Sequence, residues 1–207
     1  MKTIFKFMKF IRKSIACYLK NVYNTKEISN FNGNKNYAID ESLFTHVNNE
    51  QIWVIGIINT SDKTQFRCNY SKIRNTDYLK AFIEKYIKAG NCIISDGWSG
   101  YNFLNDENSG YHHISYNHGT GNWGVGEYST SHIESMWAYL NKSIKKIYYS
   151  IPSKGFYYFL KEAEFRYINR YKNEQQLLYI IRNILKFNFN SNGFNFETIS
   201  YLNNLNY

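Results

Sequence analysis

The chain has 207 residues, a length that suits one substantial core with an appendage. Its 25 Lys and Arg residues outnumber its 16 Asp and Glu residues, which leaves a formal charge of +9 at pH 7. This excess favours a polyanionic partner, nucleic acid above all, although an AT-rich coding sequence would also explain the many Lys and Asn residues and the 20 Tyr residues.

The three cysteines, Cys17, Cys68 and Cys92, are widely separated and form no C-x-x-C motif, so the sequence predicts neither a disulfide framework nor a zinc cluster. This fits an intracellular, reducing compartment, which would be the nucleus in a eukaryote or the cytoplasm and nucleoid in a bacterium. No run approaches the ~18 uninterrupted apolar residues that a membrane span needs, and no membrane partner is expected.

The N-terminal segment, from Lys2 to about Tyr23, is predicted to form an amphipathic helix with one buried stripe, because its apolar residues recur at three- and four-residue intervals. The stripe comprises Ile4, Phe7, Met8, Ile11, Ile15 and Leu19. The polar segment that follows contains Gly33 and is predicted to be a linker.

Three strand-like runs come next, at residues 37–44, 51–60 and 64–71, and their short connections predict an antiparallel meander. Residues 77–89 then show a helical pattern, with Thr76 as the cap and Gly90 as the stop.

The second half of the sequence alternates between strands and helices. Residues 91–97 form an apolar run directly after a helix, which predicts a buried strand parallel to its neighbours. The remaining predicted elements are a weaker strand at 112–118, a Gly-rich loop at 119–131, helices at 131–147, 155–171 and 174–187, and a frayed Asn-rich tail from 188. This order is the ribonuclease-H-like arrangement: an α/β fold with a mixed sheet, three antiparallel strands then two parallel ones, flanked by helices.

Two acids occur where strand physics disfavours them. Asp40 interrupts the apolar start of the first strand, and Asp96 ends the apolar run 91–97. A carboxylate buried there must be paired, protonated or bound to a cation, and two adjacent carboxylates repel unless a divalent metal neutralises them. A third acid, Glu134, begins the helix after the Gly-rich loop and is separated from Asp96 by 37 residues, since 134 − 96 − 1 = 37.

Six sequence blocks carry a specific resemblance over about Gly33 to Arg170. They are IDES, ISDGWSGY, YHH, YNH, SHIESMW and EFRYINR, in this order. Together they resemble the DDE transposase domain of one insertion-sequence subgroup, in which the acids occur as Asp-Glu-Ser, Ser-Asp-x-Trp-x-x-Tyr and Ile-Glu-Ser-x-Trp. The resemblance implies that Asp40, Asp96 and Glu134 are the catalytic and metal-binding acids.

The resemblance also implies a divided chain and a set of partners. Residues 1–32 would be the remnant of a DNA-binding region, 33–173 the catalytic domain, and 174–207 a C-terminal helix and tail. Two Mg²⁺ or Mn²⁺ ions at the three acids would activate a water or a DNA 3′-hydroxyl and stabilise the leaving oxygen. The expected partners are transposon ends and target DNA, bound by a homo-oligomer.

Several residues depart from the subgroup or match it only in part. Ser131 stands where the subgroup often has Asn, and Asn141 where it often has Lys, with Lys142 displaced by one position. The insert between the first two strands is shortened to THVNNEQ, and the zinc-ribbon or helix-turn-helix region of most members is missing. His118, Glu164 and Arg166 match further subgroup positions.

Supporting roles are assigned with the plainer alternative beside each. His118 is either a residue that supports the acids or a loop contact, and Trp137 is expected to pack so that it fixes Glu134. Lys142, Lys145 and Lys146 follow Glu134 on its helix and are expected to bind phosphates rather than form only a solvated face. The remaining candidates are assigned plainer roles: Glu41 is a supporting or exposed acid, Trp98 and Tyr101 are core aromatics, His112 is a surface residue, and His132 is not a metal ligand.

Three functions remain open. The first is an active transposase domain that cleaves and joins DNA strands at element ends. The second is a catalytically inactive, transposase-derived DNA-binding protein, and the third is a related metal-dependent nuclease. Retention of all three acids favours the two enzymes over the binding protein.

Overall fold

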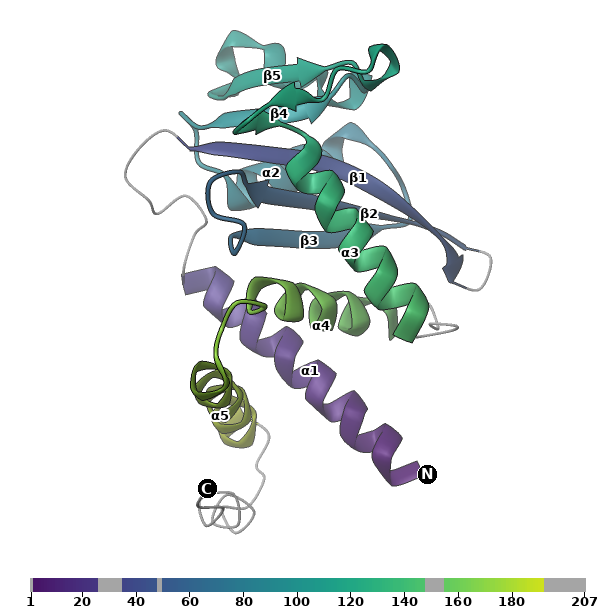
Figure 1. Ribbon diagram of the computed structural model, residues 1–207, viewed down its shortest axis with the longest axis vertical. Coiled ribbons are helices and arrows are strands. Elements are labelled where there is room, and N and C mark those ends of the chain that lie inside the picture. The colour runs from purple at the N-terminus through teal and green to yellow at the C-terminus, as the bar shows by residue number, and fades with distance from the viewer. Residues whose placement is uncertain (1, 26–34, 48–49, 148–154, 192–207) are drawn as a thin grey trace.

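The computed structural model describes residues 2–25, 35–47, 50–147 and 155–191 (Figure 1). The strands are β1 (Asn36–Val47), β2 (Glu50–Asn59), β3 (Phe66–Ser71), β4 (Cys92–Asp96), β5 (His112–Tyr116), β6 (Gly124–Val125) and β7 (Tyr128–Ser129). The α-helices are α1 (Lys2–Thr25), α2 (Thr76–Tyr86), α3 (Ser131–Ile147), α4 (Phe156–Ile168) and α5 (Glu174–Ser191). Three short 3-10 helices, η1 (Ser99–Asn105), η2 (Glu107–Ser109) and η3 (His118–Thr120), lie in the connections.

The five long strands form one mixed sheet in the order β3-β2-β1-β4-β5. The β1–β2 and β2–β3 pairs are antiparallel, whereas β4 runs parallel to both β1 and β5. This order and these directions are those of a ribonuclease-H-like fold, which confirms the fold class expected from the sequence. Helices flank the sheet on both faces (Figure 1).

Strand alternation sorts the core into two layers, because successive side chains of a strand point to opposite faces. Ala38 and Phe44 of β1 pack with Ile133 and Leu140 of α3 and with residues of α4. Ile39, the strand neighbour of Ala38, packs on the other face with buried residues of α2 and η1. The α3 face and the α2 face of the sheet are named here after these helices.

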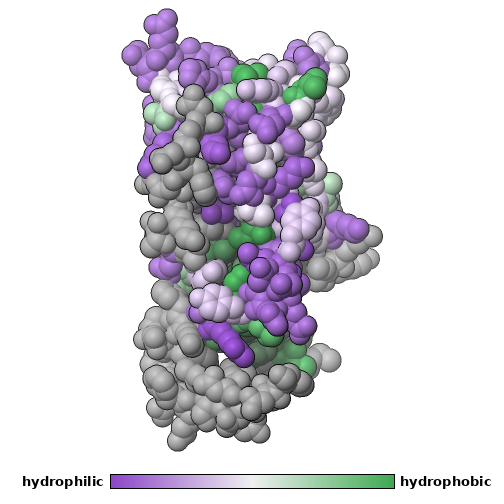
Figure 2. All heavy atoms as spheres, turned by 60° about the vertical axis from the view of Figure 1, so that its left-hand side comes forward, coloured by the Kyte–Doolittle hydropathy of each residue, from purple (hydrophilic) through white to green (hydrophobic). Residues whose placement is uncertain are grey.

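Helix α1 is buried only in part, so the single buried stripe predicted for it is wrong in its first half. Ile15 and Leu19 pack against Phe165 of α4 and Ile184 of α5. Ile4 and Phe7 are 68% and 60% exposed, because the N-terminal half of the helix extends beyond α4 (Figure 1). Figure 2 shows one face of the molecule, on which hydrophilic residues predominate in the upper half and hydrophobic residues gather at the top and again in the middle and lower part.

Other element boundaries correct the sequence-based expectations. The cap of α2 is Asn75 and not Thr76, because the Asn75 side chain accepts the Tyr78 backbone N–H. The helix ends at Tyr86, three residues before the predicted end, because Ile87 turns to an extended conformation and packs in the core.

The Gly-rich segment 119–131 is not simply a loop, since it contains the hairpin of β6 and β7. The main-chain oxygen of Trp123 accepts the Ser129 hydroxyl and the Thr130 N–H, which holds the hairpin in place before α3. Helix α3 has the predicted bounds. Helix α4 is shorter than the predicted 155–171, and α5 continues past the predicted end to Ser191, after which the tail lies outside the described residues.

Candidate active site

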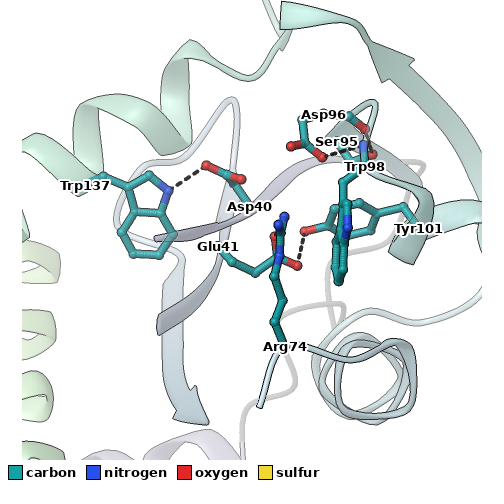
Figure 3. Close-up of polar contacts among 8 residues, drawn as sticks. All are labelled: Asp40, Glu41, Arg74, Ser95, Asp96, Trp98, Tyr101 and Trp137. Atoms are coloured by element: carbon teal, nitrogen blue, oxygen red, sulfur yellow. Dashed lines mark hydrogen bonds and ion pairs between the residues drawn. The ribbon is translucent and has the colours of Figure 1, made fainter. Parts of the chain in front are cut away.

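Asp40 is a buried carboxylate on the α3 face of the central strand β1. Asp40 is 8% exposed, and its Oδ2 accepts a hydrogen bond of 2.8 Å from Nε1 of Trp137 on α3 (Figure 3). Burial raises the pKa of Asp40 to about 7, and the charges of Glu134 and Glu41 add to this rise, while the Trp137 bond opposes it. Among the described groups that act most strongly on Asp40, none is a cation that would balance its ionised form.

The approach of Trp137 to Asp40 depends on Gly56, which is paired with Asp40 across the β1–β2 ladder. A Cβ atom at position 56 would lie 2.8 Å from Cη2 of Trp137 and 3.1 Å from Ile133. Only glycine leaves room for the indole at this point of the sheet. Sequence reasoning missed Gly56, although an isolated glycine inside an apolar strand is a signal of close approach.

Asp96 ends β4, the strand next to β1. The β1–β4 pairing ends at Ala38 and Ile94, and each acid follows two residues later, so both side chains face the α3 side of the sheet. Oδ1 of Asp96 accepts the backbone N–H of Trp98 at 3.0 Å. Figure 3 shows the two carboxylates between the side chains of Trp137 and Trp98.

Glu134 lies in the first turn of α3, and its backbone N–H donates to the Thr130 oxygen at 3.2 Å. Its charge raises the pKa of Asp40, so the two carboxylates interact through space. Among the described residues, however, no three His, Cys, Asp or Glu side chains gather closely enough to hold a metal ion. The expectation that Asp40, Asp96 and Glu134 converge on a shared ion is therefore not met in this conformation.

The donor chemistry nevertheless fits a divalent cation. The candidate ligands are carboxylate oxygens, which are the hard donors that Mg²⁺ and Mn²⁺ prefer. Asp40 accepts an indole N–H, and the described groups that act on it most strongly include no counter-ion; a bound cation would offset both its burial and the repulsion from Glu134.

For the remaining predicted site residues, most side chains lie outside the described residues. Lys142 is exposed on α3, while the side chains of Lys145 and Lys146 lie outside the described residues. His118 begins η3, and its side chain is likewise not described.

The other histidines take plainer roles. His112 is exposed, and His132 contacts the Gly126 oxygen at 2.9 Å. His113 was expected only to be a strand residue. Its ring lies 2.9 Å from the Ser95 hydroxyl and 2.7 Å from the Asn105 side-chain oxygen, and burial lowers its pKa.

Glu164 and Arg166 of the C-terminal block are not near the acids. Glu164 is fully buried and accepts a 2.6 Å contact from the Lys161 ammonium, which also donates to the main-chain oxygen of Cys68. Burial alone would lower the pKa of Lys161, but the charge and hydrogen bond of Glu164, with the smaller effect of Cys68, together outweigh burial and raise the pKa. Arg166 pairs with Glu162, which also binds Arg12 of α1 at 2.7 Å. The Lys161 contact therefore joins α4 to β3, and the Glu162 contact joins α4 to α1, so both serve the packing of the fold.

One chain of the cryo-EM structure of a simian T-cell lymphotropic virus intasome in complex with PP2A regulatory subunit B56 gamma is similar, with 12% identity and a TM-score of 0.49. The match covers 68% of this chain and 50% of that chain, so the present chain spans about half the length of that neighbour. No curated protein matches. None of the described helices is long and apolar enough to cross a membrane.

A family model described as an ISXO2-like transposase domain matches residues 20–168, which is well over half of the chain. The matched range begins within α1 and ends with α4, so it includes all three candidate acids. The chain belongs to the ISXO2-like transposase domain family.

Proposed function

We propose that this chain is the catalytic domain of a transposase that cleaves DNA and transfers strands at element ends. The observation that carries the proposal is that Asp40 and Asp96 lie on neighbouring parallel strands, each two residues beyond the last β1–β4 pair, on the face that α3 covers with Glu134. The burial of Asp40 and its raised pKa support it, because such a group is more common at functional sites than in a structural core.

Each acid has a separate task in this proposal. Asp40 and Asp96 hold one edge of the metal site, and Glu134 completes it by a shift of its side chain or of the first turn of α3. Mg²⁺ or Mn²⁺ bound there would polarise the scissile phosphate and increase the acidity of the attacking water or 3′-hydroxyl. Trp137 keeps the Asp40 carboxylate oriented through its N–H, which leaves the second oxygen of Asp40 for the ion.

DNA would lie along α3, reached through its phosphates. Lys145 follows Glu134 by three helical turns and is rotated from it by only about 20° around the helix axis. Lys142 and Lys146 extend the positive charge of the same helix, in line with the formal charge of +9. A homo-oligomer would bring two such sites to the two element ends.

The direct test is strand cleavage by wild type and Asp96→Asn. Both proteins are incubated with a supercoiled plasmid that carries candidate element ends, with Mg²⁺ or Mn²⁺ in turn. We expect wild type to nick the plasmid and Asp96→Asn to lose nicking, because the amide cannot replace the charged ligand. Asp106→Asn, an exposed acid outside the site, is the control and should cleave like wild type.

The outcomes separate the three functions. Equal nicking by wild type and Asp96→Asn refutes the role of Asp96. Binding of DNA without nicking in either metal identifies an inactive DNA-binding protein, and cleavage without any joined product identifies a nuclease.

Phosphate contacts by α3 are tested by the salt dependence of DNA affinity. The slope of log affinity against log salt should fall by about one for each lysine that contacts a phosphate when Lys142, Lys145 and Lys146 are replaced by Gln. Lys80, Lys85 and Lys88, which are exposed on or just after α2, provide the matched triple substitution and should leave the slope unchanged. Equal slopes in both triple variants would contradict the placement of DNA.

A further inference from the structure

The residue after the first acid points away from it. Glu41 follows Asp40 on β1 and therefore faces the α2 side of the sheet, where its side chain is only 2% exposed. Its Oε1 accepts a hydrogen bond of 2.9 Å from the Tyr101 hydroxyl, and its Oε2 pairs with Nη2 of Arg74 at 3.0 Å (Figure 3). Glu41 thus links the segment of the first acid to η1, which follows the second acid.

Arg74 is held between two aromatic rings. Its guanidinium carbon lies 3.6 Å from the centre of the Trp98 ring and 4.9 Å from that of Trp53 on β2. Trp98 and Tyr101 are themselves in edge contact, with their ring centres 5.9 Å apart. The four residues Glu41, Arg74, Trp98 and Tyr101 form one connected group, named here the brace.

The brace lies where the backbone ladder stops. The residue pairs between β1 and β4 end at Ala38 and Ile94, two residues before the acids. Beyond that point the separation of the strands at Asp40 and Asp96 is not set by that ladder. The brace connects the two strand ends on the α2 face of the sheet. On one side, Glu41 adjoins Asp40. On the other, the Trp98 N–H donates to the Asp96 carboxylate, and the Trp98 ring stacks on Arg74.

We propose that the brace is a positioning device that sets the Asp96 carboxylate relative to Asp40 and so shapes the metal site from the opposite face of the sheet. This inference rests on the proposed function only for the metal. Arg74 Nε has no hydrogen-bond partner among the described residues, so its burial carries a cost. A partly unsatisfied ionic group is weak evidence for stabilisation, and it agrees better with a role in geometry.

The contacts of the brace indicate separate roles for the residues of the ISDGWSGY motif. In ISDGWSGY, Asp96 supplies the ligand, Trp98 supplies the N–H that orients it, and Tyr101 ties the turn to Glu41. Arg74 belongs to no recognised block, yet it joins both blocks. Trp98 and Tyr101 therefore serve the site as positioning residues and not as surfaces for DNA bases.

The test uses Tyr101→Phe and Arg74→Lys in the full chain. Tyr101→Phe removes one hydroxyl from a buried ring, and Arg74→Lys keeps the charge but loses the flat stacking surface. Tyr111→Phe is the matched control, because the Tyr111 hydroxyl donates to the Ile87 oxygen at 2.8 Å, away from the brace.

Two readouts are measured for each protein. The first is Mn²⁺ affinity, by electron paramagnetic resonance of free Mn²⁺, with Asp96→Asn as the reference for a lost ligand. We expect both brace variants to bind Mn²⁺ about tenfold more weakly and Tyr111→Phe to match wild type. The second is hydrogen exchange of the Trp98 amide without metal, which should accelerate about fivefold in Tyr101→Phe, the equivalent of one ordinary hydrogen bond, and remain unchanged in Tyr111→Phe.

The two readouts test the metal site and the brace separately. If wild type binds no Mn²⁺, or if Asp96→Asn binds as tightly as wild type, the proposed metal site is wrong, and the Trp98 exchange rates still decide whether the brace positions Asp96. Unchanged exchange in Tyr101→Phe, or equal changes in Tyr101→Phe and Tyr111→Phe, would overturn the brace and leave the metal site standing.

Discussion

Two buried carboxylates on the α3 side of the protein have opposite surroundings. Glu164 lies 2.6 Å from the Lys161 ammonium, so its charge has a partner within the fold. Asp40 is also buried, but the described hydrogen bonds that favour its ionised form come from the neutral indole N–H of Trp137 and the Glu41 backbone, while the charges of Glu134 and Glu41 oppose its ionisation. Glu164 thus has a cation as partner, although its Oε1 has no hydrogen-bond partner among the described residues, whereas no cation is among the groups that act on Asp40 most strongly.

Burial alone therefore does not identify a functional acid. Glu164 is the more deeply buried of the two and matches a block of the family motif, yet its contacts tie α4 to β3 through Cys68. The distinguishing property is whether the charge is balanced inside the described structure. The four predictions below test that distinction at each carboxylate, in decreasing order of expected effect.

Removing the ammonium should expose the cost of an unbalanced structural charge. We expect Lys161→Met to lower the free energy of unfolding by about 3–5 kcal/mol, because Glu164 is left buried without its partner. The double variant Lys161→Met, Glu164→Leu should recover most of that loss, since the unpaired charge is gone. Urea unfolding measures both. A loss of under about 1 kcal/mol in the single variant would contradict the structural role of the pair.

At Asp40 the effect should have the opposite sign. The pKa of Asp40 in the fold is about 7, above the ordinary value of 3.8 for this carboxyl group, so the folded state resists ionisation. Stability from this group is therefore present at low pH and is lost as pH rises from about 4 to 7. In metal-free buffer, Asp40→Asn should raise the free energy of unfolding by roughly 2–4 kcal/mol at pH 8 and by far less at pH 4.

The control for this pH dependence is Glu84→Gln, an exposed acid on α2. Its stability relative to wild type should change little between pH 4 and pH 8. If Asp40→Asn also showed no pH-dependent difference, Asp40 would have to be balanced by a group in the fold, and the comparison with Glu164 would fail.

Divalent ions should act on one carboxylate and not on the other. At 100 times its dissociation constant, Mn²⁺ should stabilise wild type by about 2.7 kcal/mol. Asp40→Asn and Asp96→Asn should lose this gain. The double variant at Lys161 and Glu164 should keep it, because that pair lies apart from the site. Thermal unfolding with and without Mn²⁺ gives the values, and an equal gain in Asp40→Asn would place the ion elsewhere.

The elements and the two strand acids were accessible from the sequence because their signals are local. Asp40 and Asp96 stand out as charges in apolar runs, and the 3.6-residue period gives the bounds of α3. The strand directions also follow, since short connections indicate antiparallel pairs and the helix before β4 indicates a parallel strand.

The contacts around the acids were not accessible, because each joins distant parts of the chain. Arg74 reaches Glu41 across 33 positions, and nothing in its polar neighbourhood distinguishes it from a surface residue. The cap of α2 was misplaced by one residue because Asn75 and Thr76 both have cap-forming side chains. The hairpin β6–β7 was missed because two-residue strands have no periodicity.

The smallest expected effect concerns the space that allows Trp137 to reach Asp40. Gly56→Ala places a methyl group 2.8 Å from the indole, which must move, and we expect a loss of about 1–2 kcal/mol in stability. Because the Trp137 bond lowers the pKa of Asp40, its loss should raise that pKa further. The indole N–H resonance of Trp137 should shift, and the pH range over which stability falls should move upward. Gly155→Ala is the control, since a Cβ there meets Phe159 at an ordinary 3.6 Å. An unchanged Trp137 resonance in Gly56→Ala would show that the hydrogen bond from Trp137 to Asp40 does not depend on the absence of a side chain at position 56.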